Sequence, residues 1–355
     1  MGEKVLIKGN EVIGEAAIIA GCRYYFGYPI TPQSELPQYL SLRLPEVGGI
    51  FLQAESEVAA INMIYGAVGC GVRAMTSSSS PGVSLKMEGI SYMAGAELPC
   101  VIVNICRGGP GLGNIAPSQE DYFQATKGGG HGNYRLIVLA PASVQEAAEL
   151  TILAFELADK YRNPVMILGD GCLGQMMEPV DFEKLKTMEV TGLSDKPWAT
   201  TGCRGREPNL ISSIHLDPEE LEQHVIHLYT KYQQVKDNET RYEMRMTEDA
   251  DVVVVAYGIM ARIVKTAVEK ARKRGIKVGL FRPISLFPFP SAALAELART
   301  TPAFLVAEMN MGQMVEDVRL AVNGRRPVGF FGRSGGVVPT PFEVLTEIQK
   351  INAQV

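Results

Sequence analysis

The sequence of 355 residues has no hydrophobic run of about 18 residues, the length that a membrane-spanning helix requires. Its first residues also lack the apolar stretch of a secretory signal, so we expect a cytoplasmic protein. Charged residues make up only 21%, and the net charge of −5 gives no electrostatic reason to expect nucleic acid as a partner. The hydrophobic share of 46% is enough to bury a large core and to leave apolar surface for a partner protein.

Cysteine pairs of the metal-binding kind are also missing. No two of the six cysteines are separated by two residues, so the sequence has no CxxC pair for zinc or for an iron–sulfur cluster. The cysteines are Cys22, Cys70, Cys100, Cys106, Cys172 and Cys203. In a reducing cytoplasm the simplest interpretation is buried free thiols, and we predict no metal site on this chain.

Strand and helix patterns alternate over residues 1–180, which is typical of an α/β protein with a parallel sheet. Residues 101–105 and 165–168 are short apolar runs, as expected for buried parallel strands. Residues 56–69 have the periodicity of a helix that is buried on most of its surface. A further helix is expected over residues 10–20, with Asn10 as its N-cap.

The pattern changes after residue 180 and returns after residue 250. Residues 181–250 are richer in charge and in helix-breaking residues, and contain one expected helix that begins at Pro218 with Asp217 as its cap. Residues 251–355 resume the α/β alternation. The sequence therefore predicts two α/β domains, residues 1–180 and 251–355, joined by a connecting segment.

Two motifs in the first domain lie where a parallel sheet binds ligands, at the carboxyl ends of strands. Tyr28-Pro29-Ile30-Thr31-Pro32 follows an expected strand, and its two prolines would hold the Thr31 hydroxyl rigidly. The alternative is a plain rigid turn. Glu57 opens the apolar helix, and is either a carboxyl poised for proton exchange or an acid stabilised by the helix dipole.

Three more segments have the same ambiguity between binding and structure. The serine-rich loop 76–82 precedes a helix and would allow close approach to a ligand, or simply cap the helix. Arg107 opens a glycine-rich loop that fails the GxGxxG spacing, and it suits either a substrate carboxylate or a structural acid. His131 lies among glycines, and either exchanges protons or bonds to backbone.

One further segment imitates a cofactor motif. Gly169-Asp170-Gly171 looks like the start of the metal–diphosphate motif of thiamine diphosphate enzymes. That motif needs an asparagine about 25 residues later, but the next asparagine after Gly171 is Asn209. We interpret the segment as a turn at the end of a strand.

Taken together, the motifs resemble the α subunits of 2-oxoacid:ferredoxin oxidoreductases. The resemblance rests on the order of Tyr28-Pro29-Ile30-Thr31-Pro32, the Glu57 helix, Ser80-Pro81-Gly82, Glu97-Leu98-Pro99 and Arg107. It continues into the second domain, which is similar to the C-terminal domain of transketolases through Phe281-Arg282-Pro283-Ile284 and the segment 307–313. It implies a thiamine diphosphate-binding domain of the pyrimidine-binding type, followed by a transketolase C-terminal-like domain.

The resemblance also implies roles for individual residues. In this family a glutamate hydrogen-bonds the pyrimidine ring of thiamine diphosphate and promotes loss of the proton from its reactive carbon, and Glu57 matches that glutamate. Pro29 and Ser79 would also contact the cofactor, and Thr31 and Arg107 would hold the substrate carboxylate. His131 is expected near the site. Oxidative decarboxylation would pass an acyl group to coenzyme A and electrons to ferredoxin.

By itself the chain would be an incomplete enzyme. The resemblance implies that Mg²⁺ and four-iron, four-sulfur clusters lie on partner subunits: a β subunit with the diphosphate site and a cluster, a γ subunit and a ferredoxin-like δ subunit. Two alternatives are a self-sufficient enzyme of transketolase type and a non-catalytic assembly subunit. The sequence does not decide between a branched-chain 2-oxoacid such as 3-methyl-2-oxobutanoate and 2-oxoglutarate as the substrate.

Overall fold

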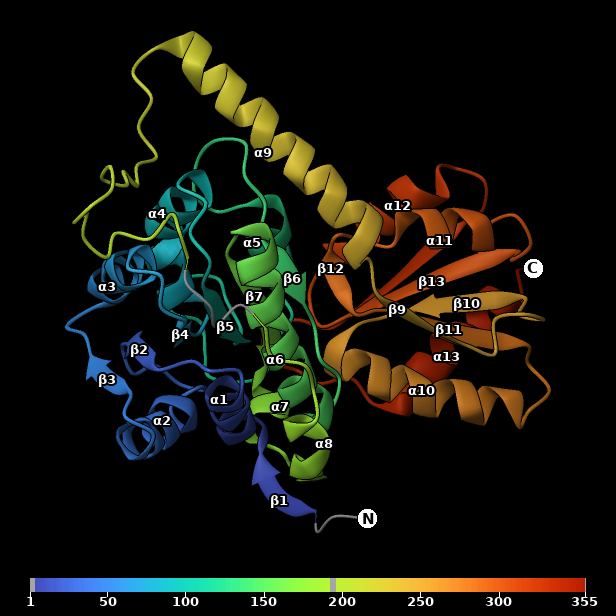
Figure 1. Cartoon of the computed structure of the whole chain (residues 1–355). Coiled ribbons are helices and arrows are strands. Elements are labelled where there is room, and N and C mark those ends of the chain that lie inside the picture. The colour runs from blue at the N-terminus through green and yellow to red at the C-terminus, as the bar shows by residue number, and fades with distance from the viewer. Residues whose placement is uncertain (1–3, 192–195, 355) are drawn as a thin grey trace.

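The computed structural model describes residues 4–191 and 196–354, and shows two α/β halves side by side (Figure 1). Residues 1–3, at the start of the chain, and residues 192–195 of the expected connecting segment lie outside the described residues. No helix in the described ranges is long and apolar enough to cross a membrane.

The first half is built on a largely parallel sheet. Within the described residues it has seven strands in the spatial order β12 (Ser285–Phe287), β6 (Ile137–Leu139), β7 (Val165–Asp170), β5 (Val101–Cys106), β4 (Ala74–Ser78), β2 (Tyr24–Gly27) and β3 (Ile50–Gln53). All neighbours are parallel except β12, which runs antiparallel to β6. The central strands β5 and β7 are completely buried, as their apolar runs predicted.

Helices cover both faces of this sheet (Figure 1). One face has α1 (Gly9–Ile19), α2 (Glu35–Glu46), α6 (Val144–Tyr161), α7 (Gly171–Gln175) and α8 (Phe182–Lys186). The other has α3 (Glu57–Gly69), α4 (Pro81–Gly95) and α5 (Tyr122–Lys127), as right-handed crossovers require for this strand order. A separate antiparallel pair joins β1 (Val5–Lys8) to β8 (Met177–Val180).

The predicted Asn10 cap is wrong. The helix begins at Gly9 with Lys8 as its N-cap, and Asn10 is buried inside the first turn. The Asn10 side-chain amide instead donates hydrogen bonds to the Pro32 carbonyl and to Glu35, both at 2.9 Å. Tertiary contact with the loop after β2 therefore overrides the local capping preference of an asparagine at a helix start.

The second half has a five-stranded sheet in the order β14 (Val328–Gly332), β13 (Ala303–Glu308), β10 (Val252–Val255), β11 (Val278–Pro283) and β9 (Tyr242–Arg245). Only β9 is antiparallel. Four helices flank the sheet: α10 (Gly258–Arg272), α11 (Ser291–Leu297), α12 (Met314–Val322) and α13 (Pro341–Asn352). The helix expected after residue 217 is α9 (Pro218–Glu239), which crosses from the first half to the second and is capped by Asp217 as predicted (Figure 1).

The two halves meet where the carboxyl ends of their strands face each other. Gln119, from the loop before α5, donates to the Tyr257 carbonyl at 3.0 Å and accepts from the Met309 amide at 3.1 Å. Arg282, at the end of β11, forms a two-pronged ion pair with Glu146 of α6, with both distances 2.9 Å. Because β12 also joins the first sheet, one continuous apolar cluster spans both halves, while a second cluster lies within the second half.

The burial of the cysteine side chains differs in part from the expectation. Cys22, Cys100 and Cys106 are buried, whereas Cys70 and Cys203 are exposed, so the prediction of buried thiols is wrong for these two.

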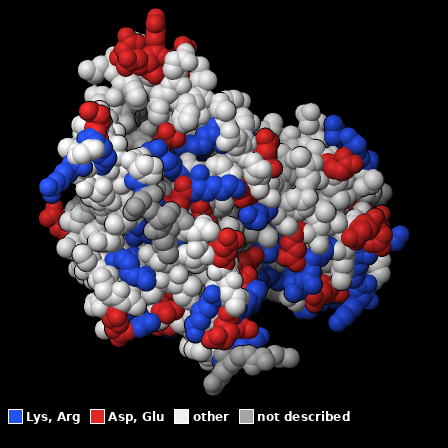
Figure 2. Space-filling model, viewed as in Figure 1, with Lys and Arg blue, Asp and Glu red and all other residues white. Residues whose placement is uncertain are grey.

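Figure 2 shows basic and acidic side chains interspersed over both halves of the face it displays. An acidic cluster stands at the start of α9, where Glu219, Glu220 and Glu222 are exposed.

Candidate functional site

The carboxyl edge of the first sheet collects most of the predicted residues. Strands β3, β2, β4 and β5 are parallel neighbours, so the loops that follow them meet at one edge. Glu57 begins the helix after β3, Thr31 follows β2, Ser79 follows β4 and Arg107 follows β5. We describe these four positions from Glu57 outwards.

Glu57 is the first residue of α3 and is only 6% exposed. The helix start is fixed by Ser56, whose hydroxyl accepts a hydrogen bond from the Ala59 amide at 3.1 Å. Within residues 4–191 and 196–354, no hydrogen bond reaches the Glu57 carboxylate. The Glu57 oxygens are not among the fully enclosed side-chain atoms, so they still reach solvent and are open to contact with a bound molecule.

The Glu57 carboxylate lies directly over Gly82, at the start of α4. A Cβ atom built on Gly82 would stand 2.6 Å from Glu57 Oε1 and 2.2 Å from Ser78 Oγ. Only glycine leaves room for both oxygens, so the chain forms a cradle at this point. The hydroxyls of Ser78 and Ser79 are buried and have no partner among the described residues.

Ser80, the residue before α4, links this cradle to the end of β5. Its backbone has φ +25°, a strained value for a residue other than glycine. Its hydroxyl donates to Asp121 at 2.6 Å and accepts from the Arg107 amide at 3.0 Å, and its own amide donates to Asn104 at 3.1 Å. Burial raises the pKa of Asp121. These contacts hold a strained turn in place next to Ser79.

Arg107 connects the end of β5 to the loop after β2. Its guanidinium donates to the backbone carbonyls of Thr31, at 3.0 Å, and Leu112, at 3.1 Å, while its Nε has no partner among the described residues. The arginine therefore has donors left for a carboxylate. Thr31 is exposed, and the loop is anchored from below where Asn10 and Gln175 both donate to the Pro32 carbonyl.

Two of the predicted residues lie at the margin of this group. Pro29 is exposed and lines a small cavity of about 220 Å³ with Phe51 and Gln53. His131 is exposed on the glycine-rich loop 128–132, which packs against α4: Gly129 lies close to Met87, and Gly130 to Ser91. The structure thus joins Glu57, Ser79, Arg107 and Thr31 through a series of contacts in which Pro29 and the loop of His131 take no part.

Sequence reasoning missed several polar residues of this region. Lys86, Asn104 and Asp121 are all buried beside it, within α4, β5 and the turn before α5. Asp121 and Asn104 are hydrogen-bonded to each other at 2.9 Å. The signal for Lys86 was present, since it occupies a position in α4 whose neighbours at 83, 87 and 90 are apolar, but a lysine normally indicates an exposed position.

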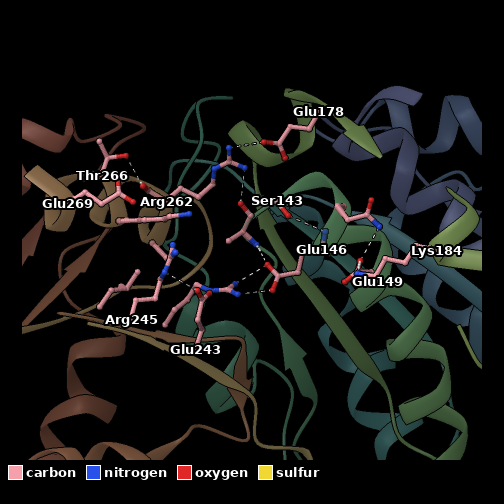
Figure 3. Close-up of a pocket in the computed structure, with 16 residues that line it drawn as sticks. Ser143, Glu146, Glu149, Glu178, Lys184, Glu243, Arg245, Arg262, Thr266 and Glu269 are labelled. Atoms are coloured by element: carbon pink, nitrogen blue, oxygen red, sulfur yellow. Dashed lines mark hydrogen bonds and ion pairs between the residues drawn. The ribbon is translucent and has the colours of Figure 1, made fainter. Parts of the chain in front are cut away.

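A large charged cleft of about 760 Å³ lies elsewhere, between the two halves (Figure 3). Its arginines are already paired: Arg282 with Glu146, and Arg262 with Glu178 at 2.7 Å. The start of α6 lines this cleft, next to β6, which is five strand spacings or roughly 24 Å from β3 in the sheet. The cleft is therefore separate from the Glu57 cradle.

No metal site is apparent in the described residues, and the cofactor-like segment 169–171 has a structural role. The described part of the chain contains no group of three or more His, Cys, Asp or Glu side chains placed to hold a metal ion. Asp170 ends β7 and caps the five-residue helix α7, accepting hydrogen bonds from the amides of Cys172 and Leu173. The segment Gly169-Asp170-Gly171 lies at the end of a strand as predicted, but β7 passes directly into α7 there without a turn.

Comparison with known proteins decides the family. Residues 15–253 match the family described as pyruvate flavodoxin/ferredoxin oxidoreductase, thiamine diphosphate-binding, and residues 250–344 match pyruvate:ferredoxin oxidoreductase core domain II. The chain belongs to the 2-oxoacid:ferredoxin oxidoreductase family. The resemblance found in the sequence, and the two-part α/β fold with a transketolase-like second half, are thereby confirmed.

Individual relatives of this oxidoreductase chain are close. It is 55% identical to the ketoisovalerate oxidoreductase subunit VorB of Methanothermobacter marburgensis, over 98% of this chain and 97% of the relative. It is 36% identical to the 2-oxoglutarate synthase subunit KorA of Methanothermobacter thermautotrophicus, over 99% and 100% of the two chains.

Solved structures agree with this assignment. The 2-oxoglutarate:ferredoxin oxidoreductase of Magnetococcus marinus, solved with 2-oxoglutarate, coenzyme A and succinyl-CoA, superposes with a TM-score of 0.89 at 27% identity. The match covers 99% of this chain but 65% of that longer one. A split-gene transketolase superposes with a TM-score of 0.62 at 17% identity, over 98% of both chains, and shows a shared fold alone.

Proposed function

We propose that this chain is the subunit that binds the pyrimidine side of thiamine diphosphate in a hetero-oligomeric 2-oxoacid:ferredoxin oxidoreductase. The observation that carries the proposal is the Glu57 carboxylate, which is buried, has no partner among the described residues and lies over a glycine that leaves room beside it. This cradle fits a flat ring with a weakly basic nitrogen. Thiamine diphosphate, once bound, supplies the nucleophilic carbon for oxidative decarboxylation of a 2-oxoacid.

In this proposal Glu57 holds a proton against the ring nitrogen. A carboxyl group suits this task because it can share a proton across a short hydrogen bond when water is excluded. The unpartnered hydroxyl of Ser79 lies at the adjoining strand end, where it can hydrogen-bond the same ring, and Pro29 borders the site. His131 lies on the far side of α4, and we propose that it closes the site from there.

Arg107 and Thr31 are proposed to hold the substrate. The guanidinium keeps free donors beside Thr31, and a planar fork matches the carboxylate that every 2-oxoacid carries. The adjoining side chains of Leu112 and Ile115 are 82% and 63% exposed, so this border of the site is apolar. Together with the 55% identity to a ketoisovalerate oxidoreductase subunit, this favours a branched-chain 2-oxoacid over 2-oxoglutarate.

The remaining parts of the enzyme are proposed to come from other subunits. Relatives are named as subunits, and the alternative of a self-sufficient transketolase-type enzyme is supported only by a shared fold. We assign Mg²⁺, the diphosphate site and a 4Fe–4S cluster to a β subunit, and further electron transfer to γ and δ subunits and an external ferredoxin, in the cytoplasm. Exposed apolar side chains flank Glu57 and suit such an interface: Ile50, Leu52, Val58, Met63, Leu85 and Tyr92.

The test uses the intact complex, purified with its partner subunits. Reduction of methyl viologen is measured with coenzyme A and pyruvate, 2-oxoglutarate or 3-methyl-2-oxobutanoate. Glu57→Gln should lower the rate by about 10²-fold or more, because the carboxyl proton is lost. Glu55→Gln, at an exposed position two residues earlier, is the matched control and should keep the wild-type rate.

Each result bears on one part of the proposal. Full activity of Glu57→Gln would contradict the assignment of Glu57, and would favour the alternative of a non-catalytic assembly subunit. A preference for 2-oxoglutarate would contradict the branched-chain assignment while leaving the reaction class intact. Tight binding of thiamine diphosphate and Mg²⁺ by the purified chain alone would favour the self-sufficient enzyme.

A further inference from the structure

Lys86 is a fully buried lysine on α4, one helical turn after Gly82. Its ammonium group donates hydrogen bonds to Thr76 Oγ1 at 2.6 Å and to the Ser77 carbonyl at 3.0 Å, both on β4. Both of these partners are neutral oxygens, a hydroxyl and a carbonyl, rather than carboxylates. A buried ammonium is costly, so a lysine at such a position calls for a reason beyond packing.

The packing of α3 against α4 places Lys86 beside Glu57. On α4, residues 82, 86 and 89 share one face, since they are four and three positions apart. Gly82 of this face meets the Glu57 carboxylate, and Gly89 meets Ile61, one turn further along α3. Lys86 lies between these two contacts. Its side chain also points back towards the start of α4, as helix geometry requires, and hence towards Glu57.

The electrostatics agree with this placement. Burial lowers the pKa of Lys86 to about 7, and the negative charge of Glu57 opposes that fall. Cys100, at the start of β5, is the other titratable group acting on Lys86; burial keeps its thiol protonated by raising its pKa. Tyr25 of β2 reaches the same network by a 2.7 Å hydrogen bond to Ser77, and burial raises its pKa too.

We propose that Lys86 is a positioning residue for Glu57 and the counter-charge of its carboxylate, an ammonium when Glu57 is an isolated carboxylate and an amine when Glu57 shares a proton with the cofactor ring. Before the cofactor binds, the opposite charges of Glu57 and Lys86 balance each other. When Glu57 takes up a proton from solvent and shares it with the ring, its negative charge is lost and Lys86 releases its own proton to solvent, so that the net exchange is close to zero. This inference rests on the proposed function.

Calorimetry on the complex tests the inference. The complex is freed of cofactor, and thiamine diphosphate with Mg²⁺ is titrated in at pH 7 in two buffers with different heats of ionisation, which gives the number of protons exchanged. Lys86→Met has nearly the same length but cannot release a proton. Its net proton uptake should therefore exceed that of the wild type by up to about one proton per site. Lys231→Met is the control. Lys231 is also a buried lysine, but it is paired with Glu97, which follows the end of α4 opposite to Gly82.

The outcomes separate the inference from the function. Equal proton counts for the wild type and Lys86→Met would overturn the inference, and so would a change of the same size in Lys231→Met. If Lys86→Met fails to assemble, Glu57→Gln replaces it: this variant neither takes up a proton at residue 57 nor releases one from Lys86, so its count should equal the near-zero count of the wild type, and a wild-type uptake of about one proton that Glu57→Gln lacks would overturn the inference. Failure of the wild-type complex to bind thiamine diphosphate at all would instead overturn the proposed function.

Discussion

The Gly82→Ala substitution tests the cradle without touching any group of the chemistry. A methyl group on Gly82 would start 2.6 Å from Glu57 Oε1 and 2.2 Å from Ser78 Oγ. Ordinary contact begins near 3.4 Å, so Oε1 must retreat by about 0.8 Å and the hydroxyl by about 1.2 Å. The carboxylate is the end of a flexible side chain and can move, so we expect the fold to survive with the carboxylate misplaced.

The substitution should change the catalytic rate much more than the free energy of unfolding. A misplacement of about 1 Å in a reacting group costs about 10²-fold in rate. For stability, alanine in a helix gains about 1 kcal/mol over glycine, while the displaced buried side chains cost about 1–3 kcal/mol. The free energy of unfolding should therefore change little, while kcat falls by about two orders of magnitude.

The assay compares Gly82→Ala with Gly69→Ala in the complex. Gly69 is also in a helix, at the end of α3, and a methyl group there meets only an ordinary contact of 3.6 Å with Ile211. Both variants are measured for urea unfolding of the chain and for 2-oxoacid-dependent reduction of methyl viologen. The reasoning is refuted if Gly82→Ala keeps wild-type kcat, or if Gly69→Ala loses as much.

Two further predictions concern the substrate and the junction between the halves. Arg107→Lys should raise KM for the 2-oxoacid by about 10-fold or more, because a lysine cannot hold two backbone carbonyls and a carboxylate together; unchanged KM would exclude Arg107 from substrate binding. Burial raises the pKa of Asp170 from 3.8 to about 6. In the folded protein this carboxyl therefore keeps its proton over a pH range in which the same carboxyl of the unfolded chain ionises. Wild-type stability should therefore fall, relative to Asp170→Asn, by up to about 3 kcal/mol as pH rises from about 4 to about 6. Urea unfolding across this range measures the difference, and a difference independent of pH would show that the folded carboxyl is ionised throughout.

Local sequence patterns were enough to predict many of the helices and strands and the positions of the loops between them. Apolar runs marked β5 and β7, because a strand buried on both faces has no polar side chains to interrupt it. Glu57 was expected at a helix start and is there, since Ser56 is a good cap and acid is favoured in the first turn. A parallel sheet then brings the loops after its strands to one edge, so the sequence also indicated which motifs would be neighbours.

Other features depend on residues far apart in the sequence and were decided only by packing. Asn10 looks like a cap but anchors the Pro32 loop, and Lys86 looks exposed but is buried beside Glu57. The short strand β12 comes from the second half and pairs with β6 of the first. Such contacts have no local pattern, because a side chain's burial and charge balance depend on which distant element covers it. The sequence by itself determined the fold class, the family resemblance and the carboxylate at the helix start; the tertiary structure alone decided that this carboxylate lies over a glycine, on the helix that also carries a buried lysine.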